Sequence, residues 1–129
     1  MARSRAVVVP SQWEETFGLV AVEAMAGGTA VIAAGHGALP EIVTPGVDGA
    51  LFPPNDVESL VRILADLDRR PSVWDNYGGH ARQTYLSRFT PEANLKSLLA
   101  VYDYAINNPV HSRSSTRPEP PVRLGPKAG

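Results

Sequence analysis

Short, wholly apolar runs alternate with a helical segment in the first half of the chain. Residues 6–9 read AVVV and residues 29–34 read TAVIAA, which is typical of buried parallel strands. Between them, residues 17–26 are predicted to form a helix that a glycine pair ends. Residues 50–52 predict a third short strand. A strand, a helix and a strand within about 30 residues indicate a βαβ unit with a parallel sheet.

The second half of the chain has helical periodicity. Asp56 is a good N-cap candidate for the first of these helices. Residues 72–88 form a weaker helical candidate, because the pair Gly78 and Gly79 interrupts it. In the helix after Asp56, the positions expected to face the core are Val57, Leu60, Val61, Leu64 and Leu67, and those expected to point outward are Glu58, Arg62 and Asp66.

The last predicted helix has a strong start. Thr90, Pro91 and Glu92 supply a cap, a proline at the first position and an acid in the first turn. The helix is predicted to run to about residue 106. Its apolar face is expected to consist of Leu95, Leu98, Leu99 and Tyr102, with Tyr102 and Tyr104 used in packing.

These elements predict an α/β domain with a Rossmann-like parallel sheet over residues 1–109. Residues 110–129 are rich in proline, serine and arginine and have almost no large apolar residue, so we expect a disordered tail. Three strands are few for a doubly wound domain, which usually has about five or six. We therefore expect the beginning of the domain to be missing.

Composition and charge argue against a metal site and against a nucleic-acid partner. The chain has no cysteine, and its three histidines lack ligand spacing, so we expect no metal site. The net charge is −1, with +3 in residues 110–129 and therefore −4 in residues 1–109. A domain that binds nucleic acid should be basic, so we expect no nucleic-acid partner.

The lengths of the apolar runs indicate where in the cell the protein lies. No apolar run approaches the ~20 residues that span a membrane, and the run near the start is too short for a signal peptide. We therefore expect a cytoplasmic protein. The basic tail is expected to be a solvated linker, with a peripheral position on the anionic inner face of the membrane as the alternative.

The chemistry is concentrated in the stretch EETFGLVAVEAMAGG, residues 14–28. Glu15 lies in the loop after a strand, and Phe17, Gly18 and Leu19 open the following helix. The first amides of a helix have no intrahelical partner and carry partial positive charge, so they can bind phosphate. In an open α/β sheet, ligands bind where strand ends meet helix starts.

Glu23 stands among apolar neighbours about one and a half turns into this helix. A carboxylate there either faces the wet side of the helix or is buried with a partner. If Glu23 faces the same cleft as Glu15, the two carboxylates could bind vicinal hydroxyls, as on a ribose or a hexose. The simpler interpretation is a solvated loop acid and a helix-surface acid.

The segment PSQWEETFGLVAVEAMAGGTAVIAAGHGALPEIV resembles the donor-binding segment of retaining group 1 glycosyltransferases, family GT4, which have the GT-B fold. The resemblance covers roughly residues 6–106. The family pattern falls on Pro10, Ser11, Glu15, Phe17, Gly18, Leu19, Glu23, Ala24, Met25, Ala26, Gly28 and Val31, and continues through Pro40, Glu41, Ile42, Val43, Gly46, Asp48, Gly49 and Pro54.

The resemblance implies a role for each residue. Glu15 would act in catalysis by contacting hydroxyls of the donor sugar. The amides of Phe17, Gly18 and Leu19 would hold sugar oxygens and the diphosphate, and Glu23 would bind the ribose. The reaction would transfer a hexose from a nucleotide-diphosphate sugar to an acceptor hydroxyl with retention. It would need no cofactor and no metal.

Two departures from the family pattern matter. The usual Gly-Gly before the Pro-Glu pair is Gly37-Ala38, a mild change in a loop. The N-terminal lobe that binds the acceptor is not found, nor is the upstream Arg/Lys pair, which Arg3 and Arg5 do not match. We therefore expect the chain to need a missing N-terminal lobe and to be inactive alone. The alternative function is a non-catalytic remnant that binds a nucleotide sugar weakly or serves as an interaction module.

Four further residue types have simpler interpretations. Phe17 is expected to be a core side chain whose amide, rather than its ring, binds ligand. His36 is expected to be a loop histidine, and the Gly27–Gly28 pair a helix stop. Trp13 and Trp74 are expected to be packing residues.

Overall fold

The structure, a computed structural model, describes residues 4–12 and 17–108. Glu14, Glu15, Trp13 and the tail over 110–129 therefore lie outside the described residues. A parallel three-stranded sheet has the order β1-β2-β3. Its strands are β1 (Ala6–Val9), β2 (Ala30–Ala34) and β3 (Gly49–Phe52). All three predicted strands are confirmed, with ends that differ by at most one residue.

The central strand β2 is buried along its whole length. Because neighbouring side chains point to opposite faces of a strand, β2 supplies two separate cores. Val31 and Ala33 pack with helix α1 (Leu19–Ala26) and the short helix α2 (Leu39–Ile42). Ala30, Ile32 and Ala34 pack on the other face, beneath α3 (Val57–Arg69). The wholly apolar sequence of this strand reflects helices on both faces.

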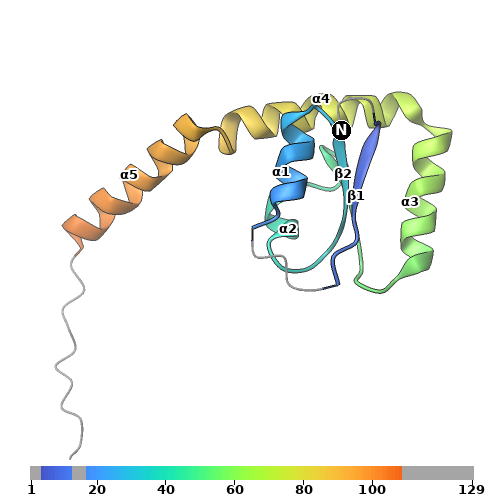
Figure 1. Ribbon diagram of the computed structural model, residues 1–129, viewed down its shortest axis with the longest axis horizontal. Helices are drawn as coiled ribbons and strands as arrows, with labels where there is room; N and C mark the ends of the chain where they lie inside the picture. The colour runs from blue at the N-terminus through green and yellow to red at the C-terminus, as the bar shows by residue number, and fades with distance from the viewer. Residues whose placement is uncertain (1–3, 13–16, 109–129) are drawn as a thin grey trace, which may run out of the picture.

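Helix α4 (Pro71–Arg88) crosses one end of the sheet and joins the two layers (Figure 1). Its first part sends Trp74 into the core beneath α3. Further along, Ala81 and Tyr85 belong to the core beneath α1. Because α4 passes the beginning of β2 at Gly78, it covers the amino-terminal ends of the strands and leaves their carboxyl ends uncovered.

The glycine pair in α4 does not interrupt the helix, so the weak helical prediction for residues 72–88 underestimated it. A Cβ on Gly78 would lie 2.5 Å from the carbonyl oxygen of Gly28. Gly79, by contrast, has nothing within 4 Å of its added Cβ. Gly78 therefore lets α4 pack closely against the backbone at Gly28. This tertiary contact outweighs the low helix propensity of glycine.

Helix α3 begins as predicted, since the Asp56 carboxylate accepts a hydrogen bond of 2.9 Å from the Ser59 amide. The predicted apolar face was partly wrong. Val57, Val61 and Leu64 are exposed, whereas Ile63 packs with the core. The buried face is rotated toward Trp74 and Tyr77 of α4; the residues that pack there are Leu60, Ile63 and Leu67.

Helix α5 (Pro91–Asn107) starts at the predicted cap, with the Thr90 hydroxyl accepting a hydrogen bond of 3.2 Å from the Ala93 amide. The helix runs away from the sheet and its covering helices (Figure 1). None of its residues is buried. The predicted packing of Tyr102 and Tyr104 was therefore wrong, as both are exposed. Neither α5 nor any other helix in the described part of the chain is long and apolar enough to cross a membrane.

Candidate functional site

The candidate site lies at the carboxyl ends of β1 and β2, where the two following loops meet. His36, just after β2, donates a hydrogen bond from its ring Nε2 to the backbone oxygen of Ser11, just after β1. His36 is part-buried there. The loop histidine expected from the sequence thus ties Ser11, just after β1, to the loop that follows β2. Carboxyl ends of parallel strands are the usual place for a ligand in this kind of sheet.

Helix α1 begins with amides that have no partner within the helix. The first helical hydrogen bond is donated by the Val22 amide to the Gly18 oxygen at 3.1 Å. The amides of Leu19, Val20 and Ala21 come before it, and no side chain caps the helix. The helix starts two residues later than predicted, but its beginning lies at the expected edge of the sheet. The arrangement suits an anion.

Gly18 shapes this beginning. Its φ is +59°, a left-handed conformation that side chains disfavour. Gly18 is buried, and a Cβ on it would overlap Cδ1 of Ile42 in α2. The left-handed backbone turn favours glycine here, whereas a shift of the flexible Ile42 side chain could relieve the overlap with an added Cβ. The position therefore sets how α1 enters from the loop.

Glu23 lies on the exposed side of α1, opposite the buried Ala21, Ala24 and Met25. It is four residues after Leu19, so the two share one face of the helix. No described residue makes a hydrogen bond or ion pair with the Glu23 carboxylate. Of the two alternatives drawn from the sequence, the wet face rather than a buried pair is correct. Whether Glu15 lies opposite is outside the described residues.

Phe17 is 72% exposed, so the prediction that it is a core side chain was wrong. Its ring borders an open apolar groove of about 510 Å³ between the start of α1 and the junction of α4 with α5. The groove is lined by Phe17, Leu19, Val22, Arg88, Phe89, Pro91 and Asn94.

Arg88 brings a cation to this groove, and sequence reasoning missed it. The Arg88 guanidinium donates a hydrogen bond of 3.0 Å to the backbone oxygen of Glu41 and lies 4.9 Å from the ring centre of Phe89. It comes from the end of α4, about 70 residues after the motif, so no local pattern could have pointed to it. Arg88 thus places a cation in the groove that Leu19, the first residue of α1, also lines.

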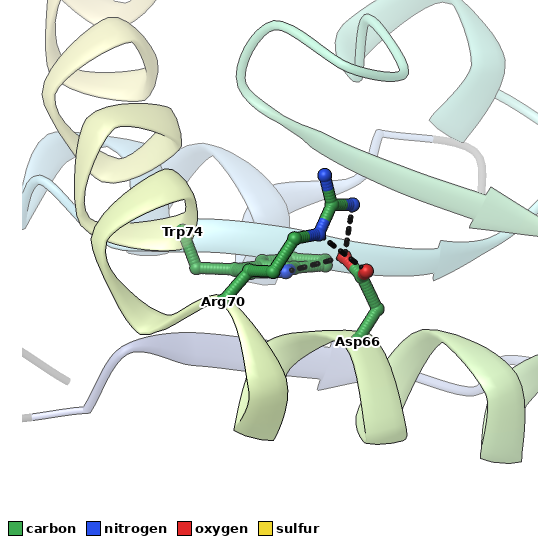
Figure 2. Close-up of polar contacts among 3 residues, drawn as sticks. All are labelled: Asp66, Arg70 and Trp74. Carbon is green, nitrogen blue, oxygen red and sulfur yellow. Dashed lines mark hydrogen bonds and ion pairs between the residues drawn. The ribbon is translucent and has the colours of Figure 1, made fainter.

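A second cavity, of about 400 Å³, lies on the other side of the sheet beside β3. Figure 2 shows its polar wall, in which the Asp66 carboxylate accepts hydrogen bonds from Arg70 and from the Trp74 ring nitrogen. The Arg70 bonds are both 2.6 Å long and hold the pKa of Asp66 below its usual value, with Trp74 contributing. These groups already satisfy one another's hydrogen-bonding capacity. We therefore interpret the cluster as stabilising the α3–α4 turn and not as a ligand site.

Asp48 is a buried carboxylate that the sequence motif included without a role. It is fully buried and accepts hydrogen bonds from the Thr44 amide at 2.7 Å and the Thr84 hydroxyl at 2.9 Å. It ties the loop before β3 to α4. Among the residues that the structure describes, no group of three or more His, Cys, Asp and Glu side chains could hold a metal ion.

The chain matches a known family and several of its members. The profile described as "Glycosyl transferases group 1" matches residues 1–84. D-inositol 3-phosphate glycosyltransferase of Mycolicibacterium smegmatis is 39% identical over 103 residues, which cover 79% of this chain and 23% of that protein. MMP alpha-(1->4)-mannosyltransferase of Mycolicibacterium hassiacum is 36% identical over 107 residues, covering 82% and 26%.

Solved structures agree with this fold. Sucrose-phosphate synthase from Thermosynechococcus elongatus superimposes with a TM-score of 0.71 at 35% identity, covering 81% of this chain and 26% of that one. HepE of Anabaena, solved in complex with UDP, gives a TM-score of 0.72 at 28% identity, covering 79% and 28%. The predicted fold class, a Rossmann-like part of a GT-B fold, is confirmed.

The chain spans about a quarter of the length of the relatives it matches. The described elements account for most of the matched region, and the predicted resemblance holds across it. The chain belongs to the group 1 glycosyl transferase family.

Proposed function

We propose that this chain supplies the donor-binding part of a retaining hexosyltransferase that uses a nucleotide-diphosphate sugar. The observation that carries the proposal is the uncapped start of α1 at the carboxyl edge of the sheet, with the exposed Glu23 on the same helix. HepE, a structural neighbour at 28% identity, has been solved with UDP and with UDP-glucose. That ligand class suits the uncapped amides at the start of α1.

In this proposal the diphosphate lies against the first turn of α1. The amides of Phe17, Gly18 and Leu19 donate to diphosphate and sugar oxygens, and Gly18 lets the ligand approach the backbone closely. Glu23, one turn further along, accepts hydrogen bonds from the ribose hydroxyls. Glu15 contacts hydroxyls of the transferred sugar. Each acceptor or donor thus meets a chemically complementary part of one ligand.

The main chemical task is to stabilise charge on the departing diphosphate. Amides fixed at a helix start do this without rearrangement, because their dipoles already point at the developing charge. Arg88 adds a full positive charge on the groove beside Phe17 and Leu19. No step in this scheme uses a metal or another cofactor. The scheme assigns no acceptor.

A second candidate is binding without transfer. The observation that favours it is coverage: relatives named as transferases are about four times as long as the matched segment. A chain with the donor site alone would bind the nucleotide sugar weakly and turn over nothing. Incubating the purified chain with UDP-glucose tests this second candidate, because release of UDP above a protein-free control would contradict binding without transfer.

Binding can be tested by calorimetric titration of the chain with UDP-glucose and with UDP. We expect Glu23→Ala to weaken binding of both about tenfold, because the ribose loses hydrogen bonds to a charged acceptor. Glu58→Ala removes an exposed carboxylate from α3, on the opposite face of the sheet, and should leave affinity unchanged. Equal affinity in the wild type and Glu23→Ala would contradict the proposed site.

A further inference from the structure

The segment that follows β2 contacts both ends of the connection between β1 and α1. At the first end, the ring of His36 donates its hydrogen bond to the backbone oxygen of Ser11. At the second end, Leu39 and Ile42 of α2 pack around the buried Gly18. A Cβ placed on Gly18 would lie 3.6 Å from Cδ2 of Leu39 and 3.8 Å from Cγ1 of Ile42. Figure 1 shows α2 beside the start of α1.

This segment, residues 35–42, is itself fixed by the fold. The Gly35 amide donates a hydrogen bond of 2.8 Å to the backbone oxygen of Phe52 at the end of β3. Leu39 is fully buried and Ile42 is 6% exposed, and both belong to the core beneath α1. Because β3 and the close-packed core set its position, the segment can serve as a rigid support for the chain that it contacts.

The amides of Phe17 and Gly18 come before α1, so hydrogen bonds within the helix do not fix their directions. Their directions depend instead on how the chain enters the left-handed turn at Gly18. Donors that are in place before a ligand arrives bind it more tightly than donors that must first be ordered. The contact from His36 to the start of the same connection therefore bears on the two amides that are proposed to hold the diphosphate.

We propose that His36 is a positioning residue for the nucleotide-diphosphate site and acts through Ser11. The inference rests on the proposed function. His36 holds the end of β1 while α2 holds Gly18, so the fold sets the span between Ser11 and Gly18. A backbone oxygen can only accept a hydrogen bond, so the ring must carry a proton on Nε2. The contact thus requires a side chain with the reach of histidine and an N–H at its far end.

Substitutions at His36 in the whole chain separate this reach from the ring itself. The amide nitrogen of a glutamine takes roughly the place of Nε2, whereas that of an asparagine takes the place of Nδ1 and does not reach Ser11. We expect His36→Ala and His36→Asn to weaken UDP binding about three- to tenfold, because the anchoring hydrogen bond is lost. His36→Gln should bind UDP within about twofold of the wild type. Calorimetric titration with UDP measures all of these affinities.

His80→Ala is the matched control. The His80 ring also donates to a distant backbone oxygen, that of Val47 at 3.1 Å, but it does so from α4, at the amino-terminal end of the sheet. Loss of this bond should lower the stability of the chain and leave its affinity for UDP unchanged. The comparison separates a general loss of stability from an effect on the site.

The amide NMR spectrum of the free chain gives a second test, which needs no ligand. The Gln12 and Gly18 signals should differ between His36→Asn and His36→Gln, which both lack the ring, and His80→Ala should leave these signals in place. A wild type that binds no UDP would contradict the proposed function and this inference with it. A wild type that binds UDP, with equal affinities in His36→Asn and His36→Gln, would overturn this inference alone. So would Gln12 and Gly18 signals that are the same in these two variants.

Discussion

Gly78 in α4 packs directly on the backbone of Gly28, the residue that ends the turn after α1. A Cβ added to Gly78 would lie 2.5 Å from the Gly28 carbonyl oxygen, closer than real Cβ atoms approach. Gly28 itself has φ +69°, which completes the stop after α1. This contact seats α4 across the amino-terminal ends of the strands, so the carboxyl ends stay open for the site.

Gly78→Ala should destabilise the fold by about 2 kcal/mol or more, because the obstructing atom is backbone and the helix must shift. Gly79→Ala is the matched control one residue away. Nothing lies within 4 Å of its added Cβ, so it should stabilise the chain by about 0.5–1 kcal/mol through helix propensity. Urea unfolding followed by circular dichroism measures both. Equal effects of the two variants would contradict the role assigned to the Gly78–Gly28 contact.

Asp48→Ala should lower the free energy of unfolding by about 3 kcal/mol, because it leaves the Thr44 amide and the Thr84 hydroxyl without their charged acceptor. Thr84→Val removes only one of these bonds and should cost about 1 kcal/mol. The control is Asp68→Ala, an exposed aspartate of α3, which should change stability by less than about 0.5 kcal/mol. An Asp48→Ala variant as stable as this control would show that the buried carboxylate is not a structural tie.

Asp66 should contribute stability that disappears in acid. Hydrogen bonds from Arg70, then Trp74, lower the pKa of Asp66 from 3.8 in the folded chain. The unfolded chain therefore binds more protons in this range, so the contribution is complete above pH 3.8 and is lost as pH falls through the folded pKa.

The difference in melting temperature between the wild type and Asp66→Asn should accordingly shrink as the pH is lowered below 3.8. Asp68→Asn, on the same helix, is the variant for comparison. A wild-type advantage over Asp66→Asn that stays constant from neutral pH into acid would rule out the linkage.

Much of the fold could be predicted from the sequence because its signals are local. The apolar runs of β1 and β2, the Asp56 and Thr90 caps and the glycine stop after α1 all act within a few residues. The errors arose where distant contacts decide. Gly78 stays helical because of Gly28, and the face of α3 is turned by Trp74 from the next helix.

In the candidate site, too, local sequence signals were predictive and contacts between distant segments were not. The edge of the sheet at which α1 begins followed from a continuous motif, although the helix starts two residues later than predicted, and Glu23 takes the exposed one of its two expected positions. Arg88 and the His36 tether could not be predicted, since each depends on a contact made across the fold. Phe17 was wrongly predicted to be a core residue because it is apolar, whereas it is exposed and borders the groove at the start of α1.

The central claim is that a nucleotide diphosphate binds at the start of α1. The most direct measurement is a titration of the ¹⁵N-labelled chain with UDP, following every backbone amide by NMR. We predict the largest shifts at Phe17, Gly18 and Leu19, with smaller ones at Glu23. The largest shifts at Arg62 and Arg70, in the cavity beside β3, would contradict the account, as would no shift at α1 at saturating UDP.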